Sequence, residues 1–454
     1  MAEQKIPTAL GTESIGKLLM QYAVPAIIAM TASSLYNMVD SIFIGHGVGA
    51  MAISGLALTF PLMNLAAAFG SLVGVGAATL ISVKLGQKDY DTAQRVLGNV
   101  FVLNILLGVA FTVVVMAFLD PILYFFGGSD NTVGYARDYM EIILLGNAIT
   151  HLYLGLNAVL RSAGYPQKAM YATIATVVIN TILDPVFIYG FGWGIRGAAI
   201  ATILAQMISL AWQLKLFSNK NELLHFHRGI FKLKRKIVTA SLAIGMSPFM
   251  MNVAACFIVI LINQGLKRYG GDMAIGAFGI VNRLVFVVVM IVMGLNQGMQ
   301  PIAGYNFGAR LYDRVTKVLK ITIAYATAVT TFGFLVGILI PDLVVAIFTS
   351  DAELIELSAR GLRVTVLFFP IIGFQMVAAN FFQSIGMAGK AIFLSLSRQL
   401  LILLPLLLIL PLFYGVDGVW YSMPVSDFLA SLIAAVMLWW QFRQFKKGAP
   451  VKQI

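Results

Sequence analysis

Acidic side chains within apolar segments are the residues of this sequence that point most directly to chemistry, because placing a charge in a membrane is costly. Asp40 and Asp184 each lie about 8–9 Å from the outer end of an apolar run, at a helical rise of about 1.5 Å per residue. Thr202 is expected at the same depth in a third run. Asn37 and Asn180 lie one turn deeper, each on the face of its aspartate by i,i+3 or i,i+4 spacing.

Carboxylate, amide and hydroxyl oxygens at one level suit a hard monovalent cation or a shared proton. Two carboxylates that lie close together in a low dielectric cannot both be ionised, so such a pair is expected to carry a proton. The pattern predicts binding of H⁺ or Na⁺, with no other metal and no organic cofactor. The alternative is that Asp40 is an interfacial acid near a helix end and Asp184 a polar residue satisfied inside the bundle.

Two prolines accompany these acids. Pro185 directly follows Asp184 and leaves the carbonyl of Thr181 without its helical partner, and Pro25 does the same for Gln21. Such carbonyls can bind ions or mark a bend that changes with conformational state. Both prolines are therefore candidate hinges, although ordinary kinks remain an alternative.

Other polar residues within apolar runs are secondary candidates. Arg283 and Asp427 are expected at similar depths and are predicted to form a buried ion pair, with a substrate-binding role as the alternative. His151 lies near the middle of its run, where a core histidine is favoured over a proton relay. His225 and His227 lack a third ligand, so no metal site is expected there.

The composition predicts an all-α integral membrane protein. The chain is 59% hydrophobic and only 11% charged, far outside the range of soluble proteins. Its single cysteine, Cys256, excludes a disulfide framework. Twelve apolar runs are long enough to cross a bilayer, near residues 18–44, 52–82, 96–118, 136–160, 168–190, 197–216, 239–264, 273–304, 318–340, 360–384, 390–413 and 418–443.

Basic residues gather on the loops of one side. The loops of the other side carry Arg137, Arg196, Lys267, Arg268, Arg360 and Arg363, and Arg283 is the base assigned to a span. By the positive-inside rule this asymmetry places both termini in the cytoplasm. The net charge of +12 is thereby explained by topology, and no nucleic-acid partner is expected.

The second half of the chain repeats the first about 222 residues later. The repeat predicts two pseudo-symmetric six-helix bundles, 1–214 and 238–454, joined by a basic cytoplasmic linker at 215–237 that lies against the inner leaflet. Duplicated halves in a membrane are typical of transporters. The matching segments include Ala50–Leu58 with Asp272–Ile280 and Leu85–Leu97 with Phe307–Leu319.

Two motifs carry a resemblance to a known family. "YNMVDSIFIG" at Tyr36–Gly45 and "NTILDPVFIYG" at Asn180–Gly190, within paired six-helix halves, resemble the multidrug and toxic compound extrusion (MATE) family. The resemblance implies a monomeric twelve-helix antiporter of a bacterial or archaeal cytoplasmic membrane. It would export cationic amphipathic compounds against an H⁺ or Na⁺ gradient while its two lobes alternate in access, and it would not be an enzyme.

The resemblance also implies roles for particular residues. Asp40, Asn180, Asp184 and Thr202 match the cation site of the DinF-like branch, and Pro25 matches the proline at which the first helix bends. NorM-like members place acidic ligands in spans 7 and 10, but this chain has no Asp or Glu within 237–263 or 361–384. Coupling is therefore predicted in the first half.

Two alternatives to drug export are weighed on the sequence. A lipid-linked saccharide flippase of the same superfamily would need several bases for the pyrophosphate, and Arg283 alone is assigned to a span. A membrane-embedded enzyme would need a nucleophile–base or metal constellation, and the sequence has no His-x-x-x-His or HExxH run. The expected partners are small cationic organic compounds and membrane lipids.

Overall fold

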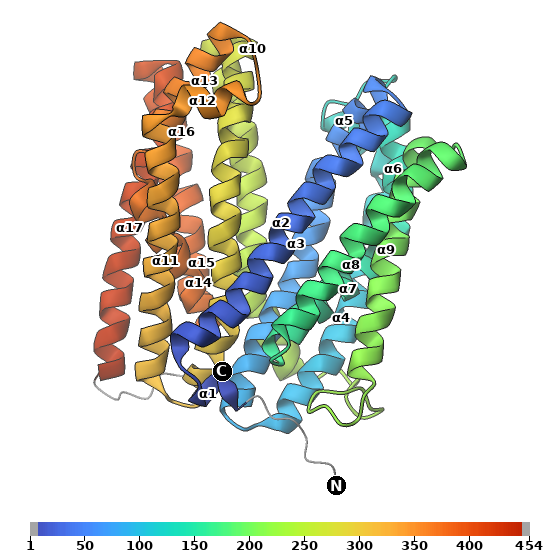
Figure 1. Ribbon diagram of the computed structural model, residues 1–454, viewed down its shortest axis with the longest axis vertical. Helices are drawn as coiled ribbons and strands as arrows, with labels where there is room; N and C mark the ends of the chain where they lie inside the picture. The colour runs from blue at the N-terminus through green and yellow to red at the C-terminus, as the bar shows by residue number, and fades with distance from the viewer. Residues whose placement is uncertain (1–7, 447–454) are drawn as a thin grey trace. The chain divides into compact units, whose positions relative to one another are not determined.

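The computed structural model describes residues 8–446, which form helices and no strand (Figure 1). Long apolar runs fold as helices in a bilayer because a helix satisfies its own backbone hydrogen bonds. The helices of the first half are α1 (Ala9–Thr12), α2 (Ile15–Gly47), α3 (Ala50–Gly86), α4 (Tyr90–Ala117), α5 (Leu119–Phe125), α6 (Val133–Leu145), α7 (Asn147–Ser162), α8 (Pro166–Pro185), the π-helical segment η1 (Val186–Gly190) and α9 (Gly194–Phe217).

The second half repeats this order. A break at Gly271, which has a φ of 68°, divides α10 into the spans Arg235–Gly271 and Met273–Gly308. The remaining helices are α11 (Tyr312–Leu339), α12 (Pro341–Ala346), α13 (Ala352–Thr365), α14 (Phe369–Ser384), α15 (Ala388–Leu396), the π-helical segment η2 (Ser397–Leu403), α16 (Leu404–Tyr414) and α17 (Val416–Lys446).

The prediction of twelve spans is confirmed. Within the described residues ten helical stretches are long and apolar enough to cross a bilayer, and two bent pairs each supply one more. The pairs are α6 with α7, bent by 56°, and α13 with α14, bent by 57°. These bends occur at matching positions of the two repeats, so the duplication extends to the irregular features of the fold.

Contacts between helices divide the chain into two compact units. Unit 1 contains Ile28–Phe249, whereas unit 2 contains Glu13–Ile27 together with the described residues from 250 to 446. The boundaries therefore fall inside α2 and inside α10, and they are about 222 residues apart, the distance of the repeat. The lobes 1–214 and 238–454, which the repeat defines, stay a prediction.

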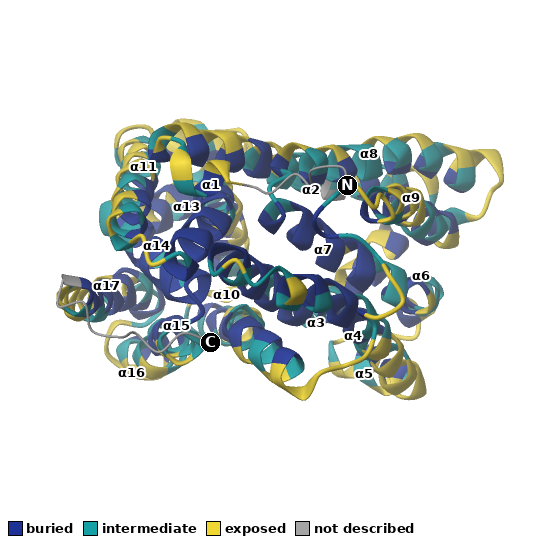
Figure 2. Cartoon of the chain, turned by 90° about the horizontal axis from the view of Figure 1, so that it is seen from below, coloured by how far each residue is buried: buried dark blue, intermediate teal, exposed yellow. Residues whose placement is uncertain are grey.

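The distribution of buried and exposed side chains is that of a membrane protein. Figure 2 shows buried residues concentrated on helices such as α7 and α14, most of whose side chains are buried. Large apolar side chains remain exposed on other helices, among them Val113, Leu412 and Val436. In water such exposure would be unfavourable, but it suits a surface that faces lipid.

Close backbone approach occurs where α3 crosses the first span of α10 within unit 1. A Cβ atom at Gly76 would lie 1.9 Å from the carbonyl oxygen of Ser241, and one at Gly245 would lie 1.7 Å from that of Leu72. Glycine lets two helix backbones meet in this way because it has no side chain. The crossing therefore depends on glycine at these positions.

We expect Gly245→Val to destabilise unit 1 by about 3 kcal/mol or more, because the valine must push the two backbones apart. The matched control is Gly279→Val in the second span of α10, since nothing lies within 4 Å of a Cβ atom there. Thermal unfolding of purified protein in detergent, followed by size-exclusion fluorescence, measures the difference. Equal melting temperatures for the two variants would contradict a tight crossing at Gly245.

Candidate cation-binding site

Three helices of unit 1 contribute the predicted polar side chains to one buried cluster. Asp40 lies on α2, Asn180 and Asp184 lie on the last turns of α8, and Thr202 lies on α9. Asp40 is 5% exposed and Asp184 is fully buried. Buried carboxyl groups persist only with partners or with a bound cation or proton, so this burial needs a chemical explanation.

Local sequence determines where α8 presents its acid. Pro185 cannot donate a backbone hydrogen bond, and the helix changes there to the π-helical segment η1. Widened turns of this kind are frequent at functional sites. The hydroxyl of Thr181 donates to the carbonyl of Val177 at 2.8 Å, so that side chain is satisfied within its own helix. Asp184 thus sits at the junction between two helical geometries.

Thr202 is the centre of the hydrogen-bond network. Its hydroxyl donates to the carbonyl of Ala198 at 3.1 Å and lies 2.9 Å from the hydroxyl of Tyr36. The amide of Asn180 satisfies both neighbours when its Nδ2 donates to Oδ2 of Asp184 at 2.9 Å and its oxygen accepts from the Thr202 N–H at 3.0 Å. The network orients the carboxyl group of Asp184.

The two acids lie within hydrogen-bonding reach of each other. Two carboxyl groups can make this contact only if they share a proton or a cation, since two bare carboxylates repel. Oδ1 of Asp40 is buried and has no hydrogen-bond partner within the described residues. No lysine or arginine of the described residues forms an ion pair with either acid. The donor set, rich in oxygen and free of paired bases, fits a proton or a monovalent cation.

Two tyrosines of this cluster, Tyr36 and Tyr139, are not among the residues predicted from the sequence. Tyr139 of α6 is 1% exposed, and its side chain lies close to Thr202. Nothing in the sequence around Tyr139 signals this role, because α6 approaches only through tertiary packing. Tyr36 precedes Asp40 by one helical turn, and that spacing is a signal that could have identified it. The side chain of Asn37 lies outside the described residues.

The predicted ion pair between Arg283 and Asp427 is wrong. Asp427 of α17 is 2% exposed and accepts a hydrogen bond of 2.6 Å from Nε of Arg398, which lies on η2. Arg283 is exposed on α10. Depth alone cannot choose between bases on different helices, whereas η2 packs directly against α17. Arg398 lies within the predicted span 390–413, and a base within a span is the sequence signal that points to this pair.

The remaining candidates occupy simpler surroundings. His151 of α7 is fully buried in unit 1, where it packs near Gly70 and Phe111. Both of its ring nitrogens are buried without a hydrogen-bond partner among the described residues, so the satisfied core histidine expected from the sequence stays a prediction. Pro25 lies inside α2, two residues before the unit boundary, and Pro185 ends α8. Within the described residues no group of three or more His, Cys, Asp or Glu side chains is arranged to hold a metal ion.

Twelve apolar spans in two repeated halves, with two buried acids in the first half that form no ion pair among the described residues, define a multi-pass membrane transporter. The family model MatE matches residues 25–186 and 243–409, and the chain belongs to this family. The family resemblance and the all-α membrane fold expected from the sequence are thereby confirmed.

Similar proteins agree with this assignment. The multidrug export protein MepA of Staphylococcus haemolyticus is 30% identical, with 94% of each chain covered. MepA of Staphylococcus aureus is 28% identical, with 93% of each chain covered. The MATE multidrug transporter DinF-BH, whose structure was solved in complex with a dye, is 34% identical. It superposes with a TM-score of 0.88 and covers 97% of this chain and 98% of its own.

Proposed function

We propose that this transporter exports cationic amphipathic compounds in exchange for H⁺ or Na⁺ bound at Asp40 and Asp184. The observation that carries the proposal is the contact between two buried carboxyl groups without a paired base among the described residues. Asn180 and Thr202 would orient the acids or supply oxygen ligands. The relatives named multidrug export proteins support the substrate class, as does the related structure with a bound dye.

Coupling needs only that each ligand binds the two conformational states unequally. A proton or Na⁺ at the acid pair would favour one state, and a bound drug would favour the other. Every tenfold difference in affinity between the states supplies about 1.4 kcal/mol of bias at 25 °C. Removing the acids would therefore uncouple drug export from the ion gradient.

Alternating access is supported by the way in which the two units share helices. α2 passes from unit 2 to unit 1 after Ile27, and α10 passes from unit 1 to unit 2 after Phe249. Pro25 and Pro248 lie within two residues of these boundaries, and a proline weakens the helix at the point where a bend is needed. Pro185 would let the end of α8 adjust around Asp184. We place both termini in the cytoplasm and the protein, as a monomer, in the cytoplasmic membrane.

The flippase alternative gains nothing from Arg398. That guanidinium is paired with Asp427, so it does not add a free positive charge for a pyrophosphate group.

Dye export from proteoliposomes tests the proposed function. With an imposed pH or Na⁺ gradient, we expect a cationic dye such as ethidium to be transported at least about tenfold faster than an anionic dye of similar size, because carboxylates without paired bases favour positive charge. The control is the same vesicles without a gradient. Equal transport of both dyes would contradict an acidic binding path.

A further inference from the structure

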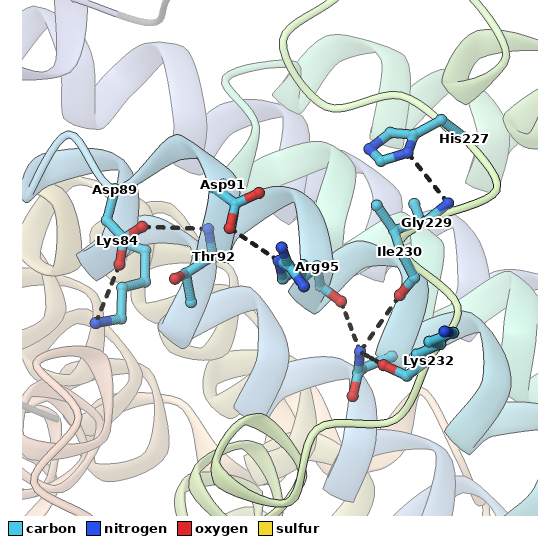
Figure 3. Close-up of polar contacts among 10 residues, drawn as sticks. Lys84, Asp89, Asp91, Thr92, Arg95, His227, Gly229, Ile230 and Lys232 are labelled. Atoms are coloured by element: carbon cyan, nitrogen blue, oxygen red, sulfur yellow. Dashed lines mark hydrogen bonds and ion pairs between the residues drawn. The ribbon is translucent and has the colours of Figure 1, made fainter.

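The segment between α9 and α10 is folded onto the cytoplasmic end of α4. Asn99 of α4 is 1% exposed, and both the nitrogen and the oxygen of its side-chain amide form hydrogen bonds with the backbone of this segment. Its Nδ2 donates to the carbonyl of Lys232 at 3.2 Å and to that of Ile230 at 3.5 Å (Figure 3). Its Oδ1 accepts from the N–H of Lys234 at 3.0 Å. These bonds set the path of the backbone through residues 230–234.

Apolar packing fixes the same segment. Ile230 is 1% exposed, and a Cβ atom at Gly98 would lie 2.3 Å from its carbonyl oxygen. The ring of Phe101 packs against those of Phe226 and Phe231, with centroids 5.6 and 5.5 Å away. Upstream, Nε2 of Gln94 donates to the carbonyl of His225 at 2.7 Å. The segment is thus an ordered part of unit 1 rather than a loose connection.

This packing leaves five basic side chains exposed within nine residues that contain no acid. They form what we call the basic face: Arg228, Lys232, Lys234, Arg235 and Lys236. None of them takes part in the ion pairs formed among the described residues. Neighbouring acids are already engaged, since Asp91 pairs with Arg95 and Glu222 with Lys168. Leu233, which is 44% exposed, projects among the bases.

We propose that the basic face binds the headgroups of anionic phospholipids in the cytoplasmic leaflet. α9 ends at Phe217 and α10 begins at Arg235, so the face lies where two membrane spans meet the headgroup layer. Clustered lysine and arginine side chains next to a span attract anionic lipids, and an exposed leucine can enter the acyl boundary. The inference rests on the cytoplasmic placement of this segment in the proposed function.

Asn99 is the positioning residue of this surface. Position 321, which matches it in the repeat, is isoleucine, so the second half lacks the clamp. Because α10 starts within the basic face, bound lipid would hold the cytoplasmic start of that helix. The surface is therefore a feature of the first half only, as the acid pair is.

Lipid selectivity of the purified full-length protein tests the inference. Association of fluorescent phosphatidylglycerol and phosphatidylcholine is measured in mixed vesicles. For Lys232→Gln/Lys234→Gln, the preference for phosphatidylglycerol should fall about tenfold. The matched control, Lys317→Gln/Lys320→Gln, removes two exposed bases at the start of α11, and it should keep the wild-type preference. Unchanged preference in the first variant, or equal losses in both, would overturn the inference.

Two further measurements sharpen the result. Asn99→Leu keeps every charge and should still reduce the preference, because the bases are no longer held together; a folded variant with wild-type preference would refute the positioning role. Excess inorganic phosphate should leave lipid association unchanged, whereas displacement would show a soluble-anion site instead. Lipid association tests this inference, whereas gradient-driven transport tests the proposed function. A variant that lost lipid selectivity and kept gradient-driven export would therefore bear on this inference alone.

Discussion

Replacing either acid of the candidate site, by Asp40→Asn or Asp184→Asn, should reduce gradient-driven export about 100-fold, a coupling of the size that linked sites typically show. Each variant leaves one carboxyl group whose partner can neither take up nor release a proton. Drug binding should survive, because the amide preserves size and the cluster keeps its other polar groups. Uptake of a cationic dye into proteoliposomes under imposed pH or Na⁺ gradients, beside a direct binding titration, separates coupling from binding.

A matched control for these variants lies on the same helix as Asp184. Thr181→Val removes a membrane-embedded hydroxyl whose one hydrogen bond among the described residues is to the carbonyl of Val177 in the same helix, and it should keep the wild-type rate. Comparing the two imposed gradients also identifies the coupling ion. If both aspartate variants retained gradient-driven transport, the coupling site would have to lie elsewhere in the chain.

Breaking the ion pair of the second half should destabilise the protein strongly. Arg398→Met leaves the carboxylate of Asp427, whose side chain is 3% exposed, without its guanidinium partner. Removing one member of a buried pair typically costs about 3–5 kcal/mol, whereas replacing both members by apolar residues is often nearly neutral. We therefore expect Arg398→Met to lower the melting temperature and Arg398→Met/Asp427→Leu to restore most of it.

Arg283→Met serves as the control for this experiment because Arg283 is exposed on α10. Thermal unfolding in detergent measures all three variants under one condition. A single variant as stable as the wild type would show that the pair contributes nothing to folding. A double variant as unstable as the single one would show that the two side chains act separately.

The candidate site could be predicted in part because depth is a one-dimensional property. Helical rise alone places Asp40, Asp184 and Thr202 at one level, and the structure brings them into one cluster. Depth does not determine how each helix is rotated about its axis or which other helices it packs against. Tyr139 enters the cluster only because α6 packs against α9, and nothing local to Tyr139 reveals it.

The ion pair between Arg398 and Asp427 also shows that depth alone does not predict which side chains meet. Arg283 and Asp427 are predicted at similar depths, yet the side chain of Arg283 is exposed although α10 also packs against α17. Arg398 is selected by the packing of η2 against α17. Depth treats all bases at one level as equivalent, whereas the ion pair forms only where the two side chains lie on helix faces that meet.

By itself, the sequence determined the positions of the spans, the duplication of the chain and the presence of Asp40 and Asp184 in the first half only. The length of an apolar run and the identity of a residue can both be read directly from the sequence. Tertiary structure decided three things: the partner of Asp427, the tyrosines around Thr202 and the packing boundaries inside α2 and α10. Each of these depends on which helix faces meet, and meeting faces are set by close packing across the whole molecule.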